Sequence, residues 1–158
     1  MTDLADFLRA RYAERRAIAE AASTWPWKIN PDDPEEVLAS DDILVADVFA
    51  LSSNQTRNTA TFIATNDPAH VIADLDAKLA LLDDLLAEGH ERNEEDHWYS
   101  CAALTDEDGN ALCFDESRAP GPCDCGRDAI INRRLRILAR PFAGHTDYQD
   151  KWRLDDTR

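Results

Sequence analysis

The sequence has no long apolar run and few of the residues that interrupt secondary structure. Among 158 residues there are five glycines, seven prolines and one methionine. No apolar stretch approaches the about 20 residues that a membrane-spanning helix requires, and the first residues lack the basic and apolar regions of a signal peptide. Fibrous and low-complexity chains are excluded by this composition. We therefore expect a globular cytoplasmic protein with no membrane partner.

Length and apolar content predict one domain over residues 1–158. The chain is 44% hydrophobic, and domains commonly contain about 100–200 residues. Within this domain we expect a helical hairpin with a small sheet over residues 1–95. Residues 96–158 are expected to form a zinc-type lobe followed by C-terminal helices.

Basic residues are scarce in the middle of the chain. Residues 17–117 contain 23 acidic and only four basic residues, and the whole chain has a formal net charge of -15. A surface of this sign repels phosphate backbones, so we expect no direct binding to nucleic acid. Five arginines gather between residues 127 and 140, and we expect them to pair mainly with the chain's own acidic middle.

Apolar periodicity predicts three main helices. Apolar residues recur three and four positions apart over residues 2–22, from Pro68 to Ala87 and over residues 127–139. Asp67 is a helix N-cap residue directly before Pro68, which suits the first helical position. We expect the first two helices to pack antiparallel. In the tail, Tyr148 and Trp152 are expected to lie on a short helix and to pack on the core.

Strand signals are confined to the first half of the chain. Residues 43–51 are β-branched and apolar and form the best strand candidate, whereas residues 59–65 fit either a strand or a helical turn. We expect a small antiparallel sheet from residues 25–51 and the cysteine segment, covered by the helix over residues 127–139. The predicted fold class is therefore α+β, mainly helical, with a long helical hairpin and a cysteine-stapled C-terminal lobe.

All four cysteines, Cys101, Cys113, Cys123 and Cys125, lie within one short segment. Disulfides are rare in a reducing cytoplasm, whereas four thiolates complete a tetrahedral zinc shell. The sequence therefore predicts that these four cysteines bind a zinc ion. A closed shell of four protein ligands is typical of structural rather than catalytic zinc.

The cysteine spacing leaves two alternatives open. Zinc ribbons usually carry C-x2-C in each half, whereas here one half is C-x-C and the other pair is separated by eleven residues. His97, four residues before Cys101, could replace one cysteine as a ligand, and His90 is the less favoured substitute. Alternatively, the cysteines form disulfides or stay unligated.

Catalytic motifs have no counterpart in this sequence. It contains no phosphate-binding loop, no dinucleotide fingerprint and no HExxH helix. His145 and Asp147 are the one candidate acid–base pair, but no recognisable motif places a nucleophile beside them. A hydrolase that uses this pair is therefore the least favoured function.

Three blocks of residues carry a resemblance that covers nearly the whole chain. The chain resembles an uncharacterised family of small proteins from actinobacteria and their phages, whose C-terminal box reads L-A-x-P-[FY]-A-x-H-x-D-Y-x-x-x-W. Thr146 stands where the family usually has proline, and Phe142 where tyrosine is frequent. The resemblance implies no activity, and it suggests a phage or prophage origin. The matching residues are Asp3-Leu4 with Phe7-Leu8-Arg9-Ala10-Arg11, Asn66-Asp67-Pro68-Ala69 with Ala77-Lys78, and Leu138-Ala139 with Pro141-Phe142-Ala143, His145, Asp147-Tyr148 and Trp152.

Two functions are compatible with these features besides the hydrolase. The favoured one is a small acidic, zinc-stapled protein-interaction module without catalytic activity, whose partner is a host or phage protein. The alternative is an acidic mimic of nucleic acid that inhibits a basic DNA-processing protein, because the acidic middle would fit a basic groove.

Overall fold

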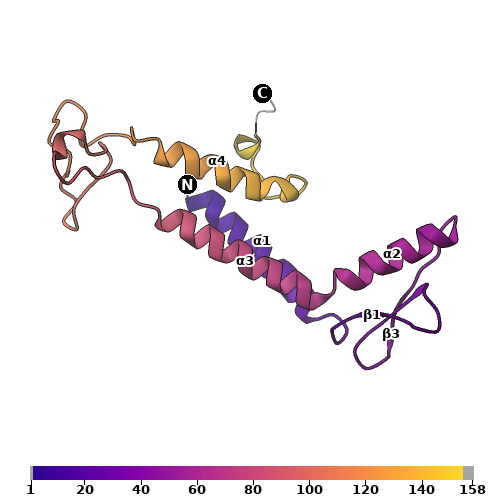
Figure 1. Cartoon of the computed structure of the whole chain (residues 1–158). Helices are drawn as coiled ribbons and strands as arrows, with labels where there is room; N and C mark the ends of the chain where they lie inside the picture. Colours follow the sequence, from indigo (N-terminus) through magenta and orange to yellow (C-terminus); the bar gives the residue numbers. More distant parts are fainter. Residues whose placement is uncertain (1, 155–158) are drawn as a thin grey trace. The chain divides into compact units, whose positions relative to one another are not determined.

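The computed structural model describes residues 2–154 and has a mixed α+β fold (Figure 1). The predicted class, mainly helical with a small antiparallel sheet, is confirmed. Among the described residues, no helix is long and apolar enough to cross a membrane. The elements are α1 (Thr2–Glu20), β1 (Lys28–Ile29), β2 (Glu36–Leu38), β3 (Leu44–Asp47), α2 (Ser53–Thr65), α3 (Pro68–Ala87), α4 (Arg127–Ala139) and three 3-10 helices, η1 (His97–Tyr99), η2 (Arg140–Phe142) and η3 (Asp150–Trp152).

The chain divides into two compact units. Residues 9–80 form one, called the sheet unit here, and residues 1–8 with 81–158 form the other, called the lobe unit. Helices α1 and α3 contribute residues to both. The division therefore falls within two helices and not at residue 95. The expectation of a single domain over the whole chain stays a prediction.

In the sheet unit, helix α2 covers a three-stranded antiparallel sheet of order β1-β2-β3. Val37 pairs with Ile29 on one side and with Ala46 on the other. Val37, Val48 and Ala60 of α2 form a buried core. Ser52 caps α2, because its side chain accepts a hydrogen bond from the backbone N–H of Gln55 at 3.3 Å.

Several strand predictions were wrong in detail. The predicted strand over residues 43–51 is shortened to β3, and residues 59–65, whose type the sequence left open, lie in α2. Within residues 2–154, the cysteine segment contributes only an isolated bridge between Thr105 and Ala111 and adds no strand to the sheet. The helix that covers the sheet is α2 and not α4. Threonine has low helix propensity, but α2 forms despite its threonines because Ser52 caps it and Ala60 is buried.

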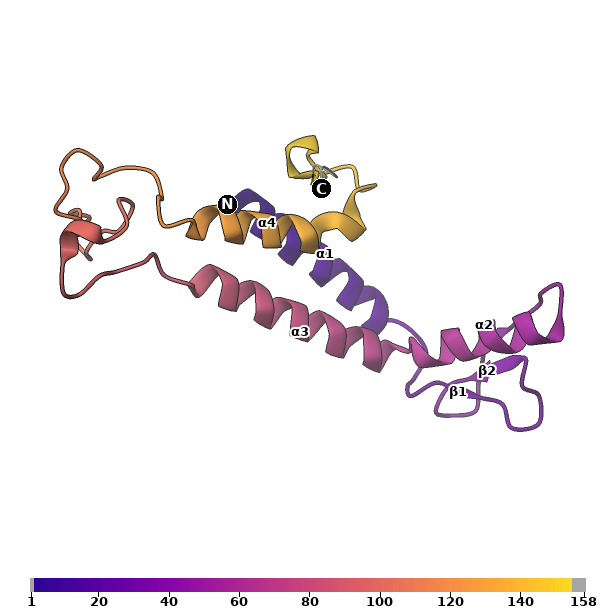
Figure 2. The ribbon, with the colours of Figure 1, turned by 45° about the horizontal axis from the view of Figure 1, so that its top comes forward.

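The segments of α1 and α3 that belong to the sheet unit run side by side in opposite directions (Figures 1 and 2). Within the sheet unit, Arg16 of α1 forms an ion pair with Asp76 of α3, and Tyr12 and Leu75 are buried. The predicted bounds of α3 and α4 are confirmed, whereas α1 ends two residues earlier than expected.

In the lobe unit, the C-terminal aromatics pack around Phe7. The ring of Phe7 lies 6.2 Å from Phe142, 6.0 Å from Tyr148 and 5.0 Å from Trp152, measured between centroids. Phe142 and Trp152 are buried, as are Ile131 and Leu135 of α4. The expectation that Tyr148 and Trp152 pack on the core is confirmed.

The N-cap of α3 also anchors strand β1. Asp67 is buried; its Oδ1 accepts from the N–H of His70 at 2.8 Å, and its Oδ2 accepts from the N–H of Trp27 at 3.3 Å.

Replacing Asp67 by alanine should lower the free energy of unfolding by about 1–2 kcal/mol, because both donors lose their acceptor. Urea denaturation measures this. Asp67→Asn, which keeps one cap acceptor, should cost less than half as much; equal losses in both variants would contradict the capping role.

Candidate metal centre

A group of four side chains lies where the chain leaves α3 and returns to α4. His90 follows Gly89, Cys101 follows η1, and Cys123 and Cys125 precede α4. Gly126, the N-cap of α4, has a φ of 84°, a left-handed conformation that glycine adopts without strain. Arg127 closes the base of this loop, because its guanidinium donates to the carbonyl oxygens of Glu88 (2.7 Å) and Leu86 (3.2 Å) at the end of α3.

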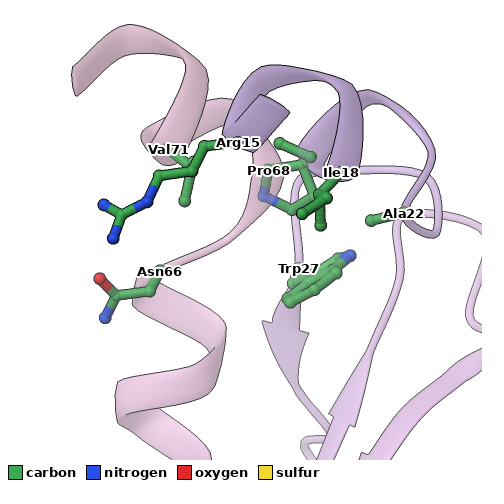
Figure 3. A pocket seen from close by; sticks show the side chains of 8 residues that line it. Arg15, Ile18, Ala22, Trp27, Asn66, Pro68 and Val71 are labelled. Carbon is green, nitrogen blue, oxygen red and sulfur yellow. The ribbon is translucent and has the colours of Figure 1, made fainter. Parts of the chain in front are cut away.

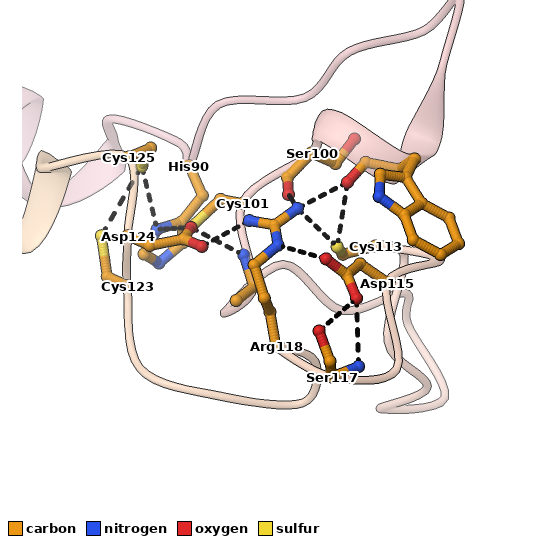
Figure 4. Close-up of polar contacts among 12 residues, drawn as sticks. His90, Ser100, Cys101, Cys113, Asp115, Ser117, Arg118, Cys123, Asp124 and Cys125 are labelled. Carbon is orange, nitrogen blue, oxygen red and sulfur yellow. Dashed lines mark hydrogen bonds and ion pairs between the residues drawn. The ribbon is translucent and has the colours of Figure 1, made fainter.

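The distances within this group match a tetrahedral metal shell (Figure 4). His90 Nδ1 lies 3.5 Å from Cys101 Sγ and 3.8 Å from Cys125 Sγ, and the sulfurs of Cys123 and Cys125 are 3.6 Å apart. All four ligand atoms lie within 4.8 Å of one another. Zinc bonds of about 2.3 Å to sulfur and about 2.0 Å to nitrogen place neighbouring ligand atoms about 3.5–3.8 Å apart. The donor set therefore fits zinc.

The surroundings of His90 also suit a metal ligand. Its Nδ1 faces the sulfurs, while its Nε2 lies 3.9 Å from Asp128 Oδ1. Zinc-bound histidines commonly direct the second ring nitrogen at a carboxylate, which orients the ring. Three thiolates on a divalent ion leave one negative charge. The N-terminal end of α4 and Arg127 lie beside Cys125 and are positive, so they favour this charge.

Cys113 lies outside the group. Its thiol lies 3.5 Å from the carbonyl oxygen of Trp98, and its Sγ lies 3.3 Å from the Nη2 of Arg118. The structure therefore brings together three of the four predicted cysteines, and His90 joins them. His97, the favoured histidine substitute, instead stacks on Phe114 with 5.1 Å between ring centroids. Metal binding at Cys101, Cys123 and Cys125 stays a prediction.

Arg118 organises the loop that carries these cysteines. Its guanidinium donates to Asp115 (2.9 Å) and Asp124 (2.5 Å), and it also lies near the carbonyl oxygens of Trp98 and Ser100. The backbone N–H of Ala102 and then Arg118 hold the pKa of Asp124 below its ordinary value. Hydrogen bonds from Ser117 and then Arg118 likewise lower the pKa of Asp115. The two carboxylates in turn raise the pKa of Arg118.

The cysteines are thiols and not disulfides in this structure. The sulfurs of Cys123 and Cys125 are 3.6 Å apart, far from the about 2.05 Å of a disulfide bond. A turn lies between Cys101 and Cys113, where the backbone N–H of Asn110 donates to Asp106 Oδ1 at 2.8 Å.

His145 and Asp147 lie in a turn after η2. The backbone N–H of Asp147 donates to His145 Nδ1 at 3.1 Å, and the carboxylate lies 3.9 Å from the same nitrogen. In a His–Asp pair that acts as a general base, Nδ1–H instead donates to the carboxylate. This local geometry is that of a turn, and the hydrolase function stays a prediction that no observation supports.

A second candidate site is an apolar hollow of about 340 Å³ in the sheet unit (Figure 3). Trp27 forms one wall and packs on the core around Val37, whereas Trp25 is 42% exposed. Trp27 therefore belongs to the core of the sheet unit, whereas Trp25 lies at its surface. Arg15 and Asn66 supply the polar groups of the hollow. Its chemistry suits an apolar group and offers no nucleophile.

Comparison with known proteins identifies the family. The model of a family of unknown function, DUF6221, matches residues 1–154. The chain belongs to the DUF6221 family. No curated protein and no solved structure matches it. Membership of DUF6221 confirms the predicted resemblance to an uncharacterised family and brings no activity with it.

Asp124 connects the two cysteines beside it to the segment after Cys101. Its Oδ1 accepts from the buried backbone N–H of Ala102 at 3.0 Å. Asp124→Ala should therefore speed hydrogen exchange of the Ala102 amide, because this donor loses its acceptor. Exchange measured by NMR tests this. Asp124→Asn, which keeps an oxygen acceptor, should exchange more slowly than the alanine variant; unchanged exchange in both would contradict the role.

Proposed function

We propose that this DUF6221 protein is a zinc-stapled protein-interaction module. The zinc ion is held by His90, Cys101, Cys123 and Cys125, whose ligand atoms already lie at tetrahedral spacing. This grouping is the observation that supports the proposal. With four protein ligands the shell is closed, so the zinc stabilises the loop and performs no catalysis.

The exposed aromatics of the loop support an interaction role. Trp98 is 50%, Tyr99 69% and Phe114 62% exposed, and they come from two adjoining segments, since the N–H of Phe114 donates to the carbonyl oxygen of His97. Tryptophan and tyrosine are enriched among the residues that dominate binding energies at interfaces. Residues 91–116 contain nine acidic residues and one basic residue. We therefore propose that the partner presents a basic segment to this surface.

The phage or prophage origin and the cytoplasmic location remain proposals of the same kind. The proposed origin rests on the family resemblance that the sequence carries. A search for the coding sequence within prophage regions tests the origin.

The zinc proposal predicts one metal ion per chain in native mass spectrometry. Serine variants of Cys101, Cys123 and Cys125 and the variant His90→Asn should each lose the ion, because each removes one ligand. Cys113→Ser and His97→Ala are matched controls that should keep it. Metal-free wild-type protein would contradict the proposal. Loss in Cys113→Ser with retention in His90→Asn would instead establish the four-cysteine shell.

Removing zinc should unfold the loop and spare the sheet unit. Residues 88–126 contain few buried side chains, so much of their folding energy would come from the metal. Hydrogen exchange with and without a chelator measures this: protection should fall over residues 90–126 and stay unchanged over residues 9–80. Equal protection of the loop in both states would count against the staple.

The interaction proposal predicts that binding to a basic partner depends on the loop aromatics. A synthetic lysine-rich peptide is a direct probe, read by fluorescence anisotropy. Phe114→Ala should weaken its binding, whereas Phe49→Ala, which removes a phenylalanine that is 84% exposed in the sheet unit, should leave it unchanged. Binding should fall with added salt, because the acidic residues supply part of the attraction. Equal binding by both variants would contradict the proposed surface.

A further inference from the structure

We propose that the lobe unit also binds a small tetrahedral oxyanion, inorganic phosphate or the phosphoryl group of a monoester, in a hollow after α4. The hollow has a volume of about 150 Å³ and is lined by three arginines, Arg136, Arg140 and Arg153, together with Tyr148. Ala143 and Leu154 also line it. Among residues 2–154, no acidic residue lines this hollow, although the chain as a whole has a net charge of -15.

Four of the five arginines between residues 127 and 140 fall into two groups. Arg127 and Arg134 are used within the chain, because Arg127 contacts Asp128 and Arg134 contacts Glu88. Arg136 and Arg140 have no carboxylate within ion-pair distance among residues 2–154. The expectation that this basic segment pairs with the chain's own acidic middle therefore holds for Arg134, whereas Arg127 pairs with Asp128 of its own helix. The unpaired guanidinium groups converge on one hollow, where they repel one another unless an anion lies between them.

Arg136 shows a second sign of a missing acceptor. Its Nε is buried and, within residues 2–154, has no hydrogen-bond partner. A buried donor without an acceptor is destabilising, and such groups are rare in folded proteins. Arg136 also lines two neighbouring hollows, which Asp128 and Asp3 line as well. An oxyanion that accepts from the terminal nitrogens of this guanidinium would offset the cost of the buried Nε with charge-assisted hydrogen bonds.

The other two polar groups are held in position by neighbours. Arg153 Nε donates to Asp150 Oδ1 at 2.9 Å, and the ring of Tyr148 packs edge-on against Trp152 at 5.7 Å and against Phe7 at 6.0 Å. The phenol is therefore anchored to the aromatic core. Holding donors in place before the ligand arrives reduces the entropy that binding would otherwise lose.

The size and chemistry of the hollow select the ligand. Its volume is half the ~300 Å³ at which pockets for drug-sized ligands begin, so it accepts a compact group and not a whole nucleotide. Planar guanidinium groups donate in pairs to oxyanions, and a phosphoryl group offers three strong acceptor oxygens to separate donors. A phosphoryl group therefore suits three arginines better than a single carboxylate does.

Isothermal titration of the zinc-loaded full chain with inorganic phosphate at constant ionic strength tests the proposal. We expect one site with a Kd on the order of 1 mM or below. Arg140→Gln and Arg136→Gln should weaken binding about tenfold, because each removes a charged donor. Arg134→Gln is the matched control on the same helix and should change it less than about twofold. Because Arg136 is partly buried, thermal unfolding checks that its variant folds, and the exposed Arg140 keeps the test decisive.

Free phosphoserine forms the second arm of the titration. Phosphate binding without phosphoserine binding would identify a free anion as the ligand, and equal binding of both would identify the phosphoryl end of a monoester. Either result supports the site. Failure of both to bind at ~10 mM, an order of magnitude above the expected Kd, would overturn the proposal. Equal weakening by Arg134→Gln and Arg140→Gln would also overturn it, because it would show diffuse charge attraction.

Discussion

The structure depends on closing the long loop between α3 and α4, which has little hydrophobic core of its own. Between α3 and α4, the described chain has one 3-10 helix, one isolated bridge and few buried side chains. Loops of this length are uncommon unless they are functional or externally constrained. Arg127 closes the loop at its base by binding the last carbonyl groups of α3. The cluster of His90, Cys101, Cys123 and Cys125 lies above this closure, where one metal ion would connect both ends of the loop to its middle.

Arg118 explains why one cysteine is excluded from that cluster. Its guanidinium contacts Cys113 Sγ, two carboxylates and two backbone carbonyls, so it occupies the space around the sulfur. The loop therefore has two groups of polar contacts, the sulfur and imidazole atoms of the candidate metal centre and the charge-assisted hydrogen bonds of Arg118, and Asp124 connects them. Such bonds are stronger than neutral ones. The separation leaves His90 to complete the tetrahedral group.

Acidic and basic residues lie in different parts of the lobe unit. The loop is strongly acidic around its exposed aromatics, whereas four arginines lie close together between residues 133 and 140. If the two regions were neutralised by each other, neither would remain available for a ligand. Arg134 and Glu88 show such pairing, but Arg136 and Arg140 form no ion pair with the part of the chain that the structure describes. The lobe unit thus presents two surfaces of opposite sign, one suited to a basic protein segment and the other to an oxyanion.

Local sequence determined the elements whose signals lie within a few neighbouring residues. Asp67-Pro68 predicted the start of α3, and apolar spacing predicted α4, because capping and periodicity act between near neighbours. The sequence also located the metal-site candidate, since its cysteines are close together. Only the tertiary structure decided that residues 59–65 are helical and that His90, and not Cys113, lies beside the other three cysteines. Those outcomes depend on contacts between distant residues, the packing of α2 on the sheet and the position of Arg118, and no local pattern encodes such contacts.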